Sequence, residues 1–427
     1  MHISSTKYRI DMKIQDIHIR NFRGIGDLYL SDLDSKVNII VGINGAGKTS
    51  ILESVAMLLS WFIARMKSPN AKGSTPLDAD IKSGSRTPCS LSITTEDGTT
   101  WSLHKHKAFS TQKRQNADKT DLKQMSELAE KIVERAGQGG NVPIVMYYPV
   151  NRAIADVPVK LHKTEYVIWD VYKDALSGNA DFRSFFEWYR QQEDIENEQI
   201  RDNPEYRDRN LDAVRRAVAA FFPDFSELRV RRRPYQAMVV NKNDEVIEFT
   251  QLSQGEKCYL SLVCDIARRL AIANPGLENP LDGEGIILID EIDLHLHPKW
   301  QSEVVMKLTE IFKNCQFFLS THSALILSNV KKKQIIPIDR GNKIEIAFET
   351  YGKPASLIMT DYFDMPNQRN LAVAKDIEEA FEAVREGNSE KYTTLRSKLL
   401  PIIGASDRDM VNLMIEAKRR GIDETNR

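Results

Sequence analysis

The sequence contains little cysteine, no excess of either charge and no long apolar run. Four cysteines in 427 residues are too few for a disulfide framework, and because none is spaced as CxxC we expect reduced thiols rather than a zinc site. Lys and Arg number 59 against 60 Asp and Glu, which excludes a strongly basic nucleic-acid coat but allows a local basic strip. No apolar run approaches the roughly 18–20 residues of a membrane-spanning helix, and the polar start Met1–Ser5 does not read as a signal peptide. We therefore expect a soluble, cytoplasmic globular protein without a membrane segment.

The strongest local pattern is a phosphate-binding loop near the N-terminus. The apolar segment Val37–Val41 predicts a buried strand, and Gly42–Thr49 then reads GxxxxGK[ST] before an amphipathic helix. Glycines let the backbone wrap a phosphate, and the helix N-terminus adds positive potential. Lys48 would reach the β- and γ-phosphates of ATP, and the Thr49 hydroxyl would ligate Mg²⁺. The expected phosphate-binding residues are Asn44, Gly45, Gly47, Lys48, Thr49 and Ser50.

A second apolar strand ends in two adjacent carboxylates. Gly285–Ile289 is followed by Asp290, which can hold Mg²⁺, and by Glu291, which can polarise the attacking water. The alternative is a core strand followed by a solvated turn. A third apolar segment, Cys315–Ser320, leads to His322, which could hydrogen-bond the γ-phosphate, although a lone histidine at a strand end is more often structural. Glu291 and His322 are the candidate catalytic residues.

The segment Leu252–Lys257 reads LSQGEK ahead of an expected helix. It resembles the LSGGQ-like signature of the ABC-type ATPases. The LSxGE variant is typical of the branch that contains the SMC and RecF proteins. The IHIRNFRGIGDL pattern that starts at Ile17 also resembles that branch. The resemblance implies an α/β ABC-type ATPase head with a mixed sheet flanked by helices. In that superfamily the signature of one head contacts the γ-phosphate held by another head. It therefore implies that Ser253, Gly255 and Glu256 act in trans, in a homodimer or a higher homo-oligomer.

The length exceeds what one hydrophobic core usually supports, so one large domain with insertions, or two to three domains, is expected. We expect an ATPase domain over residues 1–350, a helical insertion within it over 160–225, and a C-terminal helical region over 351–427 for oligomer or partner docking. Sustained apolar heptads are lacking, which excludes the long coiled coil of SMC proteins. The charged run Gln191–Asn210 predicts a solvated helix pair or arm, with a partner or DNA contact as the second interpretation.

After the insertion the chain contains a predicted hairpin, with its turn at Asn241–Asp244. A basic, strand-like segment, Glu227–Arg233, precedes this hairpin. Its arginines could bind the phosphates of double-stranded DNA, or they could protect an exposed edge strand from aggregation, and the pattern favours neither reading. The arginines are Arg229, Arg231, Arg232 and Arg233.

Two further segments are interpreted by position. The apolar strand Val142–Pro149 resembles the one that precedes the Mg²⁺-sensing loop of the superfamily, so Tyr148 or Arg152 would line that loop. The turn after Glu291 reads HLHP, which resembles the ATPases of the overcoming-lysogenization-defect type. We expect His295 and His297 to be turn or dimer-interface residues, because their spacing does not indicate a metal site.

The order of the motifs and the short helical tail most resemble the ATPases of the Septu anti-phage system and their retron-associated relatives. No acidic pattern of a TOPRIM nuclease and no HNH-type constellation follows His322. The resemblance therefore implies a separately encoded HNH nuclease partner, PtuB-like, with this chain as sensor and scaffold. The alternative is a RecF-like repair ATPase that acts on DNA without a nuclease. The apolar stripe of the first tail helix, which includes Leu371, Ile377 and Val384, suits either packing within the protein or docking to a partner.

Overall fold

A computed structural model of the chain describes residues 12–107, 119–151, 166–176, 182–363 and 369–422. The chain divides into two compact units, a larger unit of Met1–Pro354 and a C-terminal unit of Ala355–Arg427. The larger unit contains the phosphate loop, the signature and the carboxylate pair.

The centre of the larger unit is a six-stranded sheet in the order β13-β12-β3-β11-β10-β6. Its strands are β3 (Val37–Val41), β6 (Ile144–Tyr148), β10 (Gly285–Ile289), β11 (Cys315–Thr321), β12 (Ile335–Asp339) and β13 (Asn342–Lys343). Five strands are parallel and edge strand β13 is antiparallel, which confirms the mixed sheet. Every residue of β3, β6 and β10 is buried, and burial on both faces explains why these strands are mostly apolar, with Asn38 as the polar exception in β3. Because the strands are parallel and in register, Gly42, Asp290 and His322 follow strands that end at the same edge.

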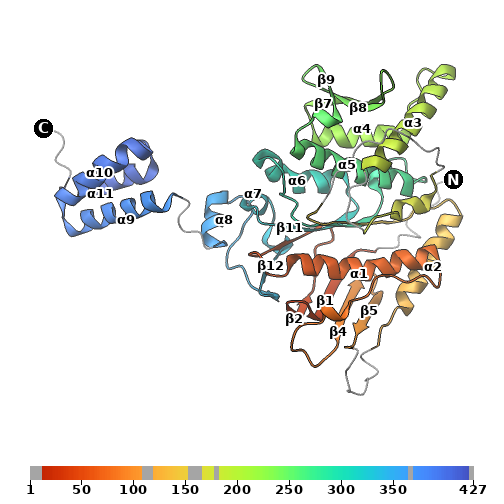
Figure 1. Ribbon diagram of the computed structural model, residues 1–427, viewed down its shortest axis with the longest axis horizontal. Coiled ribbons are helices and arrows are strands. Elements are labelled where there is room, and N and C mark those ends of the chain that lie inside the picture. The colour runs from red at the N-terminus through yellow and green to blue at the C-terminus, as the bar shows by residue number, and fades with distance from the viewer. Residues whose placement is uncertain (1–11, 108–118, 152–165, 177–181, 364–368, 423–427) are drawn as a thin grey trace, which may run out of the picture. The chain divides into compact units, whose positions relative to one another are not determined.

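Helix α1 (Lys48–Lys67) lies between the central sheet and a four-stranded antiparallel sheet (Figure 1). The second sheet comprises β1 (Ile14–Phe22), β2 (Ile25–Leu30), β4 (Cys89–Thr95) and β5 (Thr100–Lys105), and α2 (Lys123–Gly137) packs beside α1. The expected apolar stripe of α1 is buried, but Ser54 and Trp61 are buried as well because both faces of the helix are covered. Length and composition alone would allow α1 to cross a membrane, contrary to the expectation that no segment would, and its burial identifies it as a core helix.

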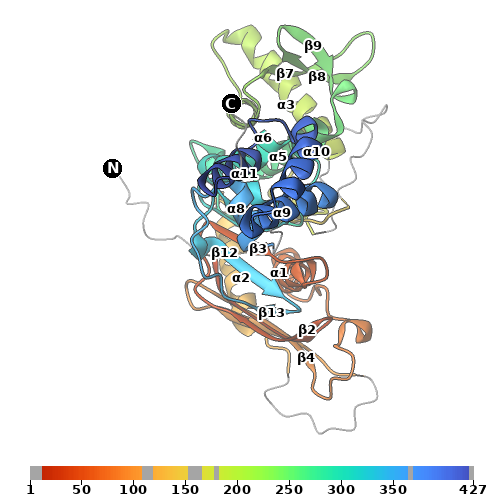
Figure 2. The same ribbon diagram turned by 90° about the vertical axis from the view of Figure 1, so that its left-hand side faces the viewer.

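The opposite face of the central sheet carries α5 (Gln254–Ala273), with α4 (Arg209–Phe221), α6 (Pro298–Ile311) and α3 (Phe182–Asp202) around it. A three-stranded antiparallel sheet of β7 (Phe225–Arg231), β8 (Ala237–Lys242) and β9 (Glu245–Glu248) lies beyond these helices. Figure 1 and Figure 2 agree in placing this small sheet at one end of the larger unit and the four-stranded sheet at the other end. The signature helix α5 and the phosphate-loop helix α1 therefore lie on opposite faces of the central sheet.

The insertion is more firmly packed than its charge pattern predicts. Helices α3 and α4 form, but Glu193 and Glu196 of the charged run are only 5% and 4% exposed. Arg215 binds Glu196 at 2.8 Å and Arg232 binds Glu193 at 2.5 Å. These arginines come from other parts of the chain, and they compensate the charges of the two glutamates at this buried seam. The helix pair forms and most of the charged run is exposed or half-buried, as expected, but the glutamates at this seam are not solvated. The predicted hairpin forms between β8 and β9.

The C-terminal unit contains α8 (Ala355–Asp361), α9 (Leu371–Glu386), α10 (Ser389–Ile403) and α11 (Arg408–Arg419). Ile377 and Val384 of the apolar stripe are buried in a cluster with Leu399 of α10 and Leu413 of α11. Leu371, by contrast, is 81% exposed. Packing among the three helices therefore covers most of the stripe that could have served a partner.

Candidate nucleotide-binding site

The phosphate loop joins β3 to α1 with its lysine already held in place. Gly42 is required because a Cβ atom there would lie 2.2 Å from the carbonyl oxygen of Ile338, and Gly47 has a φ of 109°, which favours glycine. The Nζ of Lys48 donates to the carbonyl oxygen of Gly42 at 3.0 Å. It also lies 2.7 Å from Nε2 of His322. The side chain expected to bind phosphates is therefore oriented by the loop backbone and by the switch histidine.

Thr49 and Asp290, the two expected Mg²⁺ ligands, are in direct contact. The Thr49 hydroxyl donates to Oδ2 of Asp290 at 2.7 Å. Asp290 is fully buried, and its other carboxylate oxygen accepts a hydrogen bond from the Ser320 hydroxyl. A buried carboxylate and a hydroxyl form the hard oxygen donor set that Mg²⁺ prefers, so these residues fit the cation. Sequence patterns alone did not identify Ser320.

Glu291 follows Asp290 in a left-handed backbone conformation with a φ of 47°. Its backbone N–H donates to the Ser320 hydroxyl at 2.7 Å. Such a conformation costs energy in a residue other than glycine and is found preferentially at functional sites. The turn therefore fixes the candidate general base beside the metal ligand.

His322 connects the third strand to the phosphate loop. Burial, together with the neighbouring Lys48 ammonium, lowers the pKa of His322 below its ordinary value. A neutral ring can accept a hydrogen bond from the Lys48 ammonium, which agrees with their short contact. The backbone N–H of His322 and the Thr321 hydroxyl both donate to Oδ1 of Asp293, at 3.4 and 2.5 Å. The histidine is thus connected to the turn that follows Glu291.

The signature residues cap the N-terminus of α5. The Ser253 hydroxyl accepts from the backbone N–H of Glu256 at 3.3 Å and donates to Oε2 of the same residue at 2.7 Å. Lys242 of β8 donates to Oε1 of Glu256 at 2.5 Å. A Cβ atom on Gly255 would lie 2.4 Å from the carbonyl oxygen of His295, so this glycine lets the turn approach the signature. Ser253 itself is exposed.

The two histidines of the HLHP turn have backbone roles in this structure. His295 has a φ of 64° and is exposed. His297 is the N-cap of α6, where its ring nitrogen accepts from the backbone N–H of Lys299 at 3.3 Å. Both lie in the turn, which is one of the two roles that the sequence predicted for them.

The expectation that Tyr148 lines a Mg²⁺-sensing loop was wrong, and Arg152 lies outside the described residues. The Tyr148 hydroxyl donates to Oδ2 of Asp265 on α5, at 2.9 Å, in the interior. Successive strand residues face opposite sides of a sheet, so Tyr147 faces α1 and the carboxylate of Asp290. The sequence predicted this strand, but a run of apolar residues and tyrosines does not indicate which side chains face the site.

Arg23, in the NFRG turn, is a second residue that motif reasoning left without a role. It has a φ of 50° and forms ion pairs with Glu53 of α1 and with Asp80, the latter at 2.9 Å. Glu53 lies one helical turn after Thr49, so Arg23 ties the four-stranded sheet to the helix that begins at the phosphate loop.

The basic segment begins on β7, at the edge of the three-stranded sheet, and Arg232 and Arg233 follow directly after the end of that strand. Arg231 pairs with Glu248 at 2.5 Å, and Arg232 pairs with Glu193 at 2.5 Å. Arg229 and Arg233 are exposed. Two of the four arginines therefore contribute to internal ion pairs, and two remain on the surface where phosphates could reach them.

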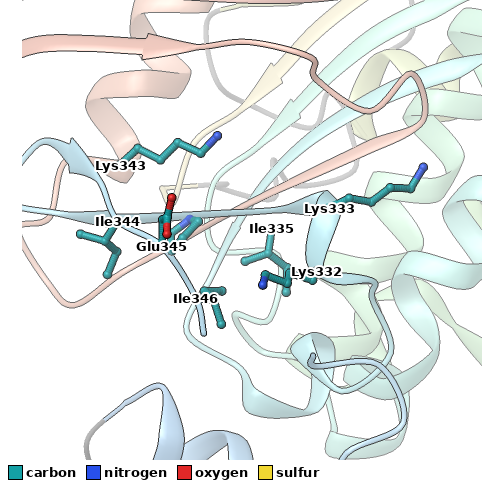
Figure 3. Close-up of a pocket in the computed structure, with 8 residues that line it drawn as sticks. Lys332, Lys333, Ile335, Lys343, Ile344, Glu345 and Ile346 are labelled. Carbon is teal, nitrogen blue, oxygen red and sulfur yellow. The ribbon is translucent and has the colours of Figure 1, made fainter. Parts of the chain in front are cut away.

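A hollow of about 380 Å³ lies at the edge formed by β12 and β13. Its basic lining residues are Lys332, Lys333 and Lys343, with the carboxylate of Glu345 among them. Figure 3 shows Lys333 and Lys343 at opposite ends of the hollow, where their ammonium groups do not converge. Because the polar lining is exposed and carries both charges, the hollow does not define an anion site.

Comparison with known proteins gives matches along most of the chain. Residues 16–218 match a family model described as an AAA domain, and residues 163–328 match one described as "AAA domain, putative AbiEii toxin, Type IV TA system". The "Retron Vc95 probable ATPase" of Vibrio cholerae serotype O1 biovar El Tor is 30% identical over 403 residues, covering 81% of this chain and 78% of the relative. The "Retron Ec83 probable ATPase" of Escherichia coli is 28% identical over 491 residues, covering 96% and 87%. The "Septu protein PtuA" of Bacillus thuringiensis is 24% identical over 404 residues, covering 90% and 93%.

Proposed function

Because this chain belongs to the PtuA-like ATPases of retron and Septu systems, we propose that it is the ATP-hydrolysing sensor and scaffold of an anti-phage defence complex. One observation carries the ATPase proposal: the ends of three strands bring the expected site residues together. Lys48 lies 2.7 Å from His322, and Thr49 donates to Asp290 at 2.7 Å.

The residues divide the reaction between them. Lys48 exchanges its carbonyl and histidine partners for the oxygens of the triphosphate, and the N–H groups of the loop bind the same oxygens. Thr49 and Asp290 would hold Mg²⁺, which would neutralise charge on the phosphates. Glu291 orients and deprotonates the water that attacks the γ-phosphate, so that ATP and water give ADP and phosphate.

The second half of the catalytic site comes from another copy of the chain in this proposal. Ser253 and Gly255 start α5, on the face of the central sheet opposite α1, and Ser253 is exposed. A second head that places its signature over the first head's phosphate loop would complete both sites in one symmetric dimer.

The partner part of the proposal rests on family membership. A separately encoded, PtuB-like HNH nuclease would supply the effector chemistry. Double-stranded DNA would be the nucleic acid on which the complex acts. The complex would work in the cytoplasm. Purification of the native complex tests this directly: a co-purifying HNH protein supports the defence assignment. Binding of recombination proteins in place of a nuclease would favour the RecF-like alternative.

A Glu291→Gln substitution tests the ATPase itself. The variant keeps the shape of the side chain but loses the base, so we expect ATP binding to persist, hydrolysis to fall by about 100-fold or more, and a closed dimer to accumulate. ATP turnover and sizing chromatography with ATP measure these effects. Glu310→Gln on the exposed surface of α6 is the matched control and should behave as the parent. Parental turnover by Glu291→Gln would show that another group is the base.

A further inference from the structure

The last two residues of β6 are both tyrosines, and their side chains serve opposite faces of the central sheet. Tyr148 faces α5, where its hydroxyl donates to Asp265 at 2.9 Å. Tyr147 therefore faces α1. Its register partner on β10 is Leu288, and Asp290 lies two residues further along on the same face. Tyr147 and the expected metal ligand are thus diagonal neighbours across two paired strands.

The Tyr147 hydroxyl is buried and has no hydrogen-bond partner among the described residues. A buried hydroxyl without a partner costs about 1–3 kcal/mol, so native proteins rarely retain one without a reason. The surroundings are polar, because the charges of Asp290, Glu53 and Arg23 all act on this phenol. Burial and the nearby carboxylates keep the pKa of Tyr147 well above its ordinary value, so the group stays a neutral hydroxyl that can donate as well as accept.

We propose that Tyr147 is a binding residue of the ATP site, whose hydroxyl hydrogen-bonds to the hydrated Mg²⁺ ion held by Thr49 and Asp290. The inference rests on the proposed ATPase function and extends it by one named group. Mg²⁺ usually keeps several water ligands when a protein binds it, and one of these waters could hydrogen-bond to a hydroxyl that lies beside the carboxylate ligand. Tyr147 would thereby sense the bound Mg²⁺, the role for which the sequence had suggested Tyr148 or Arg152.

The two adjacent tyrosines allow a matched test by Tyr147→Phe and Tyr148→Phe in the full-length chain. Each substitution removes one buried phenol oxygen from the same strand. Without nucleotide, Tyr147→Phe should melt at the parental temperature or above it, because no hydrogen bond is lost. Tyr148→Phe should melt at a lower temperature, because the carboxylate of Asp265 loses a donor.

The decisive measurement is ATP binding as a function of Mg²⁺ concentration, with a chelator as the metal-free reference. Tyr147→Phe should need about 3- to 10-fold more Mg²⁺ for half-maximal binding, the value of one hydrogen bond. Metal-free ATP affinity should not change. Tyr148→Phe should keep the parental Mg²⁺ requirement despite its lower stability.

A parental Mg²⁺ requirement in Tyr147→Phe would overturn the inference and identify the hydroxyl as a packing flaw of the core. So would a loss of thermal stability in Tyr147→Phe, without nucleotide, equal to that in Tyr148→Phe. Failure of the proposed function looks different: the parental chain itself would show no Mg²⁺-dependent ATP binding, and the inference about Tyr147 would fall with it.

Discussion

The Ser320 hydroxyl holds two residues of the site at once, because it donates to Asp290 and accepts from the backbone N–H of Glu291. Ser320→Ala should therefore misplace both the metal ligand and the base while leaving the phosphate loop intact. We expect the turnover number to fall by about 5- to 100-fold, equivalent to about 1–3 kcal/mol, and ATP affinity to change by less than about threefold. Steady-state ATPase assays and equilibrium ATP binding give the two quantities.

Ser302→Ala is the control for Ser320→Ala, because the Ser302 hydroxyl donates only within α6 in this structure, to the carbonyl of Lys299. It should leave turnover unchanged. Equal turnover in Ser320→Ala and in the parent would mean that backbone geometry alone positions Glu291. The sequence predicted the strand that carries Ser320 but did not single out this residue, because a serine at a strand end acquires its role only when β10 and β11 pair.

At the level of elements, Lys242 of β8 connects the small sheet to the signature helix. Burial disfavours the charged form of Glu256, but hydrogen bonds from Lys242 and Ser253 hold its pKa below the ordinary value. Lys242→Met should release the carboxylate that fixes Ser253. We expect ATP-dependent dimerisation to weaken by about 3- to 10-fold, with the fold intact. Sedimentation of the Glu291→Gln background with ATP would measure it.

Lys313→Met, at an exposed lysine just after α6 and outside the signature, is the control and should dimerise like the parent. Dimerisation of Lys242→Met at the parental ATP and protein concentrations would mean that the capping hydroxyl is fixed by α5 alone. The small sheet would then have no part in setting the signature.

The basic strand β7 allows structural and DNA-binding roles to be separated. If the surface pair contacts DNA phosphates, Arg229→Gln with Arg233→Gln should weaken DNA binding and reduce the log–log salt slope by about 2, without lowering the melting temperature. The internal pair should behave oppositely: Arg231→Gln with Arg232→Gln leaves Glu193 short of a partner and should lower the melting temperature. Salt-dependent DNA binding and thermal unfolding test both pairs.

Unchanged DNA affinity and salt slope after substitution of the surface pair would leave β7 as a protected edge strand. The sequence could place these arginines on a strand beside a hairpin, but it could not tell which of them would be neutralised. That depended on Glu193 and Glu248, which come from α3 and β9 and meet β7 only in the folded chain. For the same reason, the sequence did not predict that the second face of α1 is buried, because the four-stranded sheet covers that face only in the folded chain.

At the level of the whole molecule, the phosphate loop and the signature start helices on opposite faces of one sheet. In the proposed dimer, each ATP site is therefore built from the phosphate loop of one chain and the signature of the other. We expect Lys48→Ala and Ser253→Arg to be inactive separately, the first through its phosphate loop and the second through its signature. A mixed dimer has one composite site in which both halves are intact. Equimolar mixing should restore roughly a quarter of the parental turnover, since about half the dimers are mixed and each has one working site. Verified mixed dimers without recovered turnover would exclude the trans arrangement, whereas activity of Ser253→Arg by itself would show that the signature is dispensable.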